Sequence, residues 1–205
     1  MIKINDRVNV DIDPYKTDPQ LLQDLKEGCN DVAWNKFYEK YRYFISTIAG
    51  RYNVPAADRD GTVNEVLGEL WRTRDRFEYD PQKTFRGWLY KMTKHYIFRT
   101  RRSRLQANTV NADPLEPIEN GEDEEFDRIW NEEWAKFVLE RALKMLQKKM
   151  DPRSYQVFYA VTLGEKKSDE VAKEFGIKTE NVYSIKFAGM KLLNAFGCSL
   201  EIKED

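Results

Sequence analysis

Residues 85–102 read FRGWLYKMTKHYIFRTRR, and this stretch decides how the chain is organised. Trp88, Leu89, Met92 and Tyr96 recur at three- and four-residue intervals, which is the spacing of one face of an α-helix. Lysines and arginines stand between these apolar positions, and no acid interrupts them. We therefore predict an amphipathic helix that buries one face and carries positive charge on the other.

Upstream of this stretch, helical signals account for most of the chain. The pair Asp18-Pro19 is typical of an N-cap followed by proline at the first helical position. Apolar residues at helical spacing predict a second helix over residues 34–52 and, after Pro55, a third over residues 63–71. No segment alternates with period two for long enough to predict a sheet. With the helix that begins near Phe85, the expected unit is a four-helix module.

Downstream, the apolar rhythm stops over residues 103–122, where prolines, asparagines and acids dominate. Such a composition is typical of a flexible acidic linker. Helical spacing returns at Phe126 and continues to Leu146. Asp151-Pro152 then opens another helix, which Gly164 is expected to end.

The next residues favour a helix-turn-helix. Ser168 is the expected cap of a short helix, Gly176 suits the turn, and Thr179 is the expected cap of a longer helix. Ala172 is small where the helices cross, and Ile177, Val182 and Phe187 are expected to close the core. A plain helical hairpin would show the same spacing.

We therefore expect an all-α fold of two small helical domains joined by an acidic linker. The expected divisions are an N-terminal extension 1–17, a four-helix domain 18–102, the linker 103–122, a helix-turn-helix domain 123–197 and a tail 198–205.

The net charge of −1 conceals a separation of charge along the chain. No acid occurs in residues 81–112, whereas the segment that follows is strongly acidic. Aromatic rings interleaved with cations suit single-stranded DNA, since bases stack on rings and phosphates attract cations. The same rings at helical spacing are also what a buried core face requires. An ordinary solvated face, however, would mix both signs of charge.

Other classes of protein find less support. His95 is the only histidine, and Cys29 and Cys198 lie far apart in the sequence, so no catalytic set, metal site or cofactor is predicted. We expect no enzymatic activity. No apolar run approaches the length of a membrane span, so a cytoplasmic protein without a membrane partner is expected.

From about Asp18 to Gly197 the chain resembles the extracytoplasmic-function sigma factors of bacterial RNA polymerase, which belong to the sigma-70 family. The resemblance rests on a helical module containing FRGWLY at 85–90, an acidic linker and a helix-turn-helix. It implies that residues 58–72 dock on the clamp coiled coil of core polymerase, and that residues 80–102 open and read the minus-ten element. Residues 153–193 would read the minus-thirty-five element, with the flap as a second polymerase contact. The acidic linker would thread polymerase channels that nucleic acid later occupies.

Three sets of candidate residues follow from this resemblance. The polymerase-binding set is Asp58, Asp60, Asn64, Glu65, Glu69, Trp71 and Arg72. The minus-ten set is Lys83, Arg86, Tyr90, Lys91, Lys94, His95, Arg99, Arg101 and Arg102. The minus-thirty-five set is Lys178, Thr179, Glu180, Asn181, Tyr183, Ser184, Lys186, Phe187 and Lys191.

Some positions depart from the family pattern. His95 and Arg99 stand where the family often has asparagine and aspartate near the flipped minus-ten base. Tyr183 and Ala188 stand where basic residues are frequent in the recognition helix. Either upstream duplex is read weakly, or residues such as Tyr183 read a different sequence.

The expected function is that of a sigma factor that binds core polymerase and directs promoter recognition, DNA melting and initiation. Its partners would be core polymerase and promoter DNA, including the single-stranded non-template strand, together with any anti-sigma factor or other helper protein. Two alternatives stay open: an adaptor or decoy that binds polymerase but reads promoters weakly, and a stand-alone helix-turn-helix regulator of duplex DNA.

Overall fold

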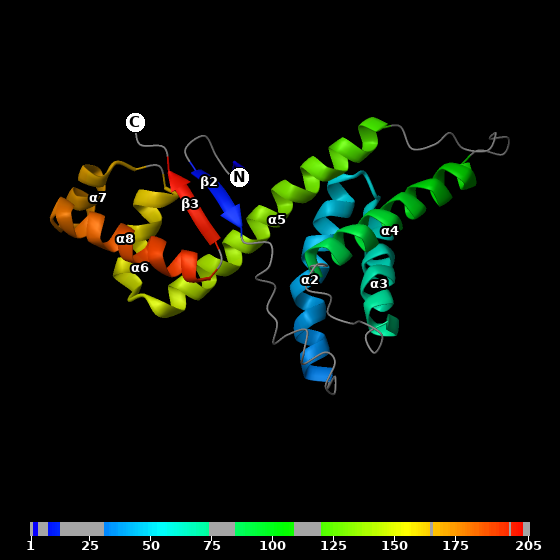
Figure 1. The fold of residues 1–205 in the computed structure, drawn as a ribbon, viewed down its shortest axis with the longest axis horizontal. Helices are drawn as coiled ribbons and strands as arrows, with labels where there is room; N and C mark the ends of the chain where they lie inside the picture. Colours follow the sequence, from blue (N-terminus) through cyan, green and yellow to red (C-terminus); the bar gives the residue numbers. More distant parts are fainter. Residues whose placement is uncertain are drawn as a thin grey trace. The chain divides into compact units, whose positions relative to one another are not determined.

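The computed structural model describes residues 2–3, 8–12, 31–73, 85–108, 120–164, 166–196 and 198–202 (Figure 1). The chain divides into two compact units, Pro14–Glu133 and Met1–Asp13 with Trp134–Asp205. The helix predicted after Asp18 lies outside the described residues. No helix within the described ranges is long and apolar enough to cross a lipid bilayer.

The unit Pro14–Glu133 is built from α2 (Asp31–Arg51), α3 (Ala56–Thr73), α4 (Phe85–Asn108) and the first turns of α5 (Asn120–Lys149). α3 packs against both α2 and α4. The apolar stripes predicted from the sequence form its core, where Ile45, Ile48, Val66 and Leu89 are fully buried. The helices predicted on both sides of Pro55 and from Phe85 are therefore confirmed.

The other unit holds the rest of α5, then α6 (Pro152–Thr162), α7 (Ser168–Phe175) and α8 (Thr179–Ala195). The carboxylate of Asp151 accepts hydrogen bonds from the backbone amides of Arg153 and Ser154, at 3.1 and 3.0 Å. Hydrogen bonds with the Ser154 side chain and with these amides lower the pKa of Asp151. Asp151 is thus the predicted N-cap of α6, with Pro152 at the first helical position. The two helical modules expected from the sequence are confirmed.

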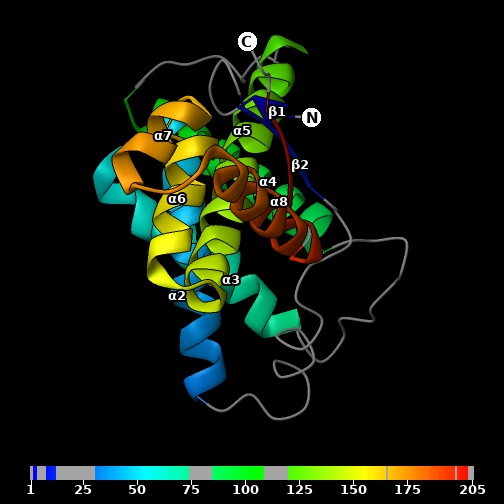
Figure 2. The ribbon, with the colours of Figure 1, turned by 90° about the vertical axis from the view of Figure 1, so that its left-hand side faces the viewer.

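α7, a short turn and α8 follow one another as predicted, with α8 packed on both α6 and α7 (Figure 2). Gly176 adopts the left-handed conformation at φ 62°, which glycine reaches without steric cost. The two caps are corrected by one residue: Lys167 and Lys178 hold the N-cap positions, and Ser168 and Thr179 are the first helical residues. At α7, the carboxylate of Glu170 accepts a 3.3 Å hydrogen bond from the Lys167 amide, so Ser168 is not needed as a cap.

The core between α6, α7 and α8 contains Val171, Ala172 and Val182, with Ile177 packed against it. Phe187 is a correction, because its side chain is 72% exposed and closes no core. Five residues after Val182, at about 100° per residue, Phe187 points to the opposite side of α8. The inner face is completed by Gly189 and Leu193 instead.

A three-stranded antiparallel sheet also joins the two ends of the chain, against the expectation of no sheet. β1 (Ile2–Lys3) pairs with β2 (Val8–Ile12), and β2 pairs with β3 (Cys198–Ile202) (Figure 1). The sequences VNVDI and CSLEI do alternate with period two, but each for only five residues. Parts of the predicted N-terminal extension and C-terminal tail are therefore strands in one unit.

The helices also extend into the predicted linker. α4 continues to Asn108 and α5 begins at Asn120, so residues 103–108 and 120–122 are helical. The segment SRLQAN at 103–108 contains good helix formers and no proline, which lets α4 continue past its apolar stripe. Acids at the start of α5 favour the positive end of its helix dipole. The division between the compact units falls inside α5, after Glu133.

Candidate nucleic-acid interface

α4 separates its apolar and cationic residues onto different faces. Phe85, Leu89 and Ile97 are almost completely buried. The side chains on the outer face are exposed and follow one another at intervals of three or four residues, which keeps them on one side of the helix. They are Lys91, His95, Arg99 and Arg102. A row of exposed nitrogen-bearing side chains therefore runs along α4.

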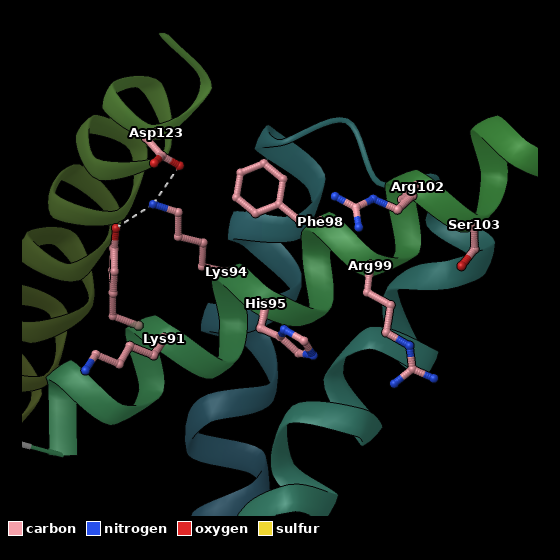
Figure 3. Close-up of a pocket in the computed structure, with 9 residues that line it drawn as sticks. Lys91, Lys94, His95, Phe98, Arg99, Arg102, Ser103 and Asp123 are labelled. Atoms are coloured by element: carbon pink, nitrogen blue, oxygen red, sulfur yellow. Dashed lines mark hydrogen bonds and ion pairs between the residues drawn. The ribbon is translucent and has the colours of Figure 1, made fainter. Parts of the chain in front are cut away.

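A cavity of about 530 Å³ lies between this row and the start of α5 (Figure 3). Its volume is in the range of pockets that hold small ligands. It is lined by Tyr90, Lys91, Lys94, His95, Phe98, Arg99, Arg102, Ser103 and Asp123. Aromatic rings for stacking and cations for phosphate thus stand together, and Asp123 adds one carboxylate from α5.

Lys94 is held inside the protein. Its ammonium lies 2.9 Å from a carboxylate oxygen of Asp123 and donates to the hydroxyl of Tyr90 at 3.1 Å, as the dashed lines of Figure 3 show. It also lies 5.6 Å from the centre of the Phe126 ring. Burial by itself lowers the pKa of Lys94, but the bonds to Asp123 and Tyr90 leave it raised. Its charge is therefore largely matched within this unit.

Arg86 and Tyr90 also contact α5. The guanidinium of Arg86 donates to Asn131 at 2.7 Å, and burial lowers the pKa of Arg86. The hydroxyl of Tyr90 donates to the carboxylate of Asp127, and burial together with this bond raises the pKa of Tyr90. Three residues of the predicted minus-ten set thus position α5 against α4.

The first turns of α5 belong to the core of this unit. Phe126, Ile129 and Trp130 are at most 2% exposed. The ring of Phe126 lies edge-on to Tyr52 and Tyr90, with centroids 5.4 and 5.5 Å apart. Fully burying such side chains contributes about 1.5–3 kcal/mol each. The apolar spacing at 126, 129 and 130 was visible in the sequence, but it was assigned to the downstream domain.

Two further cations of α4 lie close to aromatic rings. The guanidinium of Arg101 lies 4.7 Å from the centre of the Tyr52 ring, and that of Arg99 lies 5.7 Å from the Tyr96 ring. Lys83 lies outside the described residues. Among the predicted minus-ten residues that the structure describes, Lys91, His95, Arg99 and Arg102 are the exposed ones.

The candidate polymerase-binding residues lie along α3. Asp60, Asn64, Glu65 and Arg72 are exposed. Within this group, the guanidinium of Arg72 lies 2.9 Å from Glu69 and 3.9 Å from Glu65, and its pKa is raised, chiefly by the hydrogen bond with Glu69. This surface therefore carries acids at helical spacing with one arginine among them.

Members of that set also contact other helices. The carboxylate of Asp58 pairs with Arg104 of α4. The ring of Trp71 packs edge-on against Trp34, with centroids 4.8 Å apart. Asn64 remains exposed while its side-chain oxygen accepts a 2.8 Å hydrogen bond from Tyr38. Asp58 and Trp71 are better placed to hold α3 than to reach a partner.

The predicted minus-thirty-five residues begin at the turn before α8. The side chains of Lys178, Glu180, Asn181, Tyr183, Ser184, Phe187 and Lys191 are exposed. Thr179 is half-buried and its hydroxyl donates to Asp169 at 3.0 Å, and Lys186 is half-buried. The Ser184 hydroxyl donates to the backbone carbonyl of Glu180 at 3.0 Å. Thr179 and Lys186 are thus less accessible than the other candidate residues of this set.

Comparison with known proteins assigns the α2–α4 region to a family. Residues 37–106 match Sigma-70 region 2. The solved structure of CnrH in complex with the cytosolic domain of CnrY aligns with a TM-score of 0.37 and 18% identity over 87% of this chain and 95% of that chain. No curated protein sequence gives a significant match.

The cationic row of α4 therefore lies in a segment that is similar to Sigma-70 region 2. The resemblance drawn from the sequence is thus supported over residues 37–106. Similarity to this region supports a sigma-factor role in transcription initiation.

Proposed function

We propose that this protein is a sigma factor of the extracytoplasmic-function type that gives core RNA polymerase its promoter specificity. The observation that carries the proposal is the pocket in region 2, where aromatic rings and exposed cations line one cavity. Such a surface suits a strand whose bases have left the duplex, because rings accept bases and cations accept phosphates.

The minus-ten element is opened and held by α4. Extruding a base from the stack costs a few kcal/mol, and stacking on an aromatic ring returns about 1–3 kcal/mol per base. The exposed cations Lys91, Arg99 and Arg102 supply attraction for the phosphates on both sides of the base. Catalysis of RNA synthesis stays with the polymerase.

The polymerase contact is made by the exposed acids of α3. Asp60 and Glu65 project from the helix surface, with Arg72 about two turns beyond Glu65. α3 itself packs against α2 and α4. A charged surface of this kind favours recognition by complementary charge on the clamp coiled coil.

The upstream duplex is contacted by α7 and α8, acting as a helix-turn-helix of a region 4. The left-handed turn at Gly176 and the buried Ala172 and Val182 fix the angle between the two helices. This module also meets the polymerase flap, and the protein works in the cytoplasm. An anti-sigma factor or other helper protein remains a predicted partner.

A transcription assay with fragmented genomic DNA from the source organism tests the proposal and separates its rivals. Core polymerase with this protein should start at a defined set of sites, which neither component selects alone. Binding to core polymerase without new start sites would favour the adaptor. Binding to defined duplex sites without polymerase would favour the stand-alone regulator.

A further inference from the structure

The outer face of α8 carries two exposed aromatic side chains one helical turn apart. Phe187 is 72% exposed and Tyr183 is 55% exposed. Their spacing places both rings on the same side of the helix. The opposite side of α8 is occupied, since Val182 and Leu193 are fully buried. These rings are therefore not part of the core of this unit.

Several polar groups near the rings are already engaged within the protein. Thr179 donates its hydroxyl to Asp169, and Ser184 donates its hydroxyl to the carbonyl of Glu180. Glu180 and Asn181 are exposed beside the rings. The neighbouring Ala188 adds a methyl group to the same exposed surface. Tyr183, Phe187 and Ala188 therefore give this exposed surface an apolar part, which lies beside the polar groups of Glu180 and Asn181.

The major groove of DNA offers one apolar group to such a surface. Each base pair presents hydrogen-bond donors and acceptors there, and only thymine adds a methyl group. A ring placed against guanine or cytosine would remove polar edges from water without replacing their hydrogen bonds, whereas a ring against thymine buries a methyl group. Selectivity by apolar contact therefore means selectivity for thymine.

We propose that Phe187 and Tyr183 read thymine methyl groups in the upstream duplex. This inference rests on the proposed function and specifies the class of sequence that α8 recognises. Duplex DNA is favoured over a protein partner by charge, because exposed lysines precede and follow the rings at Lys178 and Lys191. An apolar protein surface would offer those cations no opposite charge.

The test uses holoenzyme assembled from core polymerase and the full chain. A promoter found by run-off transcription is given a randomised upstream segment, and the templates bound best are selected. We expect thymine to be enriched at fixed upstream positions. Replacing those thymines by deoxyuridine removes the methyl groups alone, and should weaken binding about fourfold for each contacted methyl.

The double variant Phe187→Ala with Tyr183→Ala should bind the thymine and deoxyuridine templates equally. The matched control is Tyr159→Ala on α6, which removes a ring that is 47% exposed and lies outside α8, and should keep the preference for thymine. Binding of both templates within about twofold by the unaltered protein would overturn the inference. The inference is equally overturned if the double variant keeps the methyl preference, or if it weakens assembly with polymerase instead.

The failure of the proposed function would look different. Holoenzyme that initiates on thymine templates but ignores the methyl groups contradicts this inference alone. Holoenzyme that selects no start sites on any template contradicts the proposed function, and the inference falls with it.

Discussion

Single cations of α4 differ in what surrounds them, and this sets what each can do for a bound strand. Lys91 is exposed at the edge of the pocket, whereas the Lys94 ammonium is 2.9 Å from Asp123. A phosphate bound at Lys91 would pair with the positive charge of an exposed ammonium. One that meets Lys94 must compete with a carboxylate already in place.

Substituting these two lysines should therefore have unequal effects. Lys91→Ala should lower the salt dependence of open-complex formation by about 0.7 per lost phosphate contact. Lys94→Ala should change that slope less and should lower the unfolding midpoint, because it removes the link between α4 and Asp123. Equal slopes for both variants and the unaltered protein would assign Lys91 to an ordinary solvated surface.

Arg51 and Glu132 make a second residue-level link within the same unit. The guanidinium of Arg51 lies 2.8 Å from Glu132 and 2.7 Å from Glu133, and Arg128 lies 2.9 Å from the other oxygen of Glu132. Partial burial by itself would raise the pKa of Glu132, but the hydrogen bonds and charges of both arginines hold it below its usual value. The ionised carboxylate therefore stabilises the folded unit.

This link should make stability depend on pH with a definite sign. Because the pKa of Glu132 is lower in the folded protein, its contribution is present above the unfolded pKa of about 4.3 and disappears as the pH falls through the folded value. Glu132→Gln should lose about 1 kcal/mol of unfolding free energy near pH 7. Urea unfolding between pH 7 and 4 should show this gap narrowing at the acid end.

The exposed acid Glu140 provides the control for that measurement, since Glu140→Gln removes a carboxylate from the surface of α5. It should show little loss and no narrowing. A gap for Glu132→Gln that stays constant across the range would mean that the arginines do not act through the charge of Glu132.

Sequence patterns predicted the charge and exposure of these residues better than they predicted which other residues they contact. The cationic row of α4 follows from spacing alone, and its exposed members lie where the helical period places them. The pairing of Lys94 with Asp123 joins residues from two helices, and no local pattern contains that information. Phe187 was assigned to the core because it is apolar, although its position relative to Val182 puts it outside.

At the scale of the elements, close packing of α8 on α6 depends on a glycine. A Cβ atom added at Gly189 would collide with the ring of Phe158, which is fully buried. Gly189→Ala should therefore destabilise the fold by about 1–3 kcal/mol through overpacking. Thermal or urea unfolding measures this loss.

Gly61 makes the matched comparison, because it lies inside α3 and a Cβ there meets nothing within 4 Å. Gly61→Ala should stabilise the protein by about 0.5–1 kcal/mol, since alanine is the better helix former. The same substitution is thus expected to act with opposite signs in two helices. A stabilising Gly189→Ala would contradict the packing of α6 against α8.

Reversing a charge on the exposed side of α3 is expected to weaken binding to core polymerase. Glu65→Lys reverses a charge beside Arg72 and should weaken association with core polymerase by about tenfold or more, as charge reversal at a complementary interface does. Fluorescence anisotropy of a labelled chain titrated with core polymerase measures the change. Glu140→Lys, an equal reversal on α5, should leave the affinity nearly unaltered. Loss of affinity in both variants would indicate a general effect of charge.

Elements were predicted well where their signals are local. Asp151-Pro152 and Gly176 acted as the cap, first turn and terminator that the sequence indicated. The sheet was missed because β2 and β3 are short and come from opposite ends of the chain, so their partners are invisible to a local reading. The ends of α4 and α5 were missed because helix propensity, rather than an apolar stripe, extends them.

At the scale of the whole molecule, α5 belongs to both compact units of the chain. Its first turns pack Phe126 and Trp130 into the unit Pro14–Glu133, whereas Leu139 and Leu146 belong to the core that contains Phe158 and Leu193. The acidic segment that the sequence marked as a linker thus ends in a helix that both units use. Asp123 and Asp127 of α5, which lie just after the predicted linker, contact the ammonium of Lys94 and the hydroxyl of Tyr90 in α4.

Core polymerase and this protein should open promoter DNA only when they act together. Permanganate oxidation of unpaired thymines around a start site measures this opening directly. We predict reactive thymines only when core polymerase and this protein are both present, and weaker reactivity when Lys91, Arg99 and Arg102 are replaced by alanine together. Unchanged reactivity with the protein left out, or none with both present at a site that the protein selects, would contradict the account.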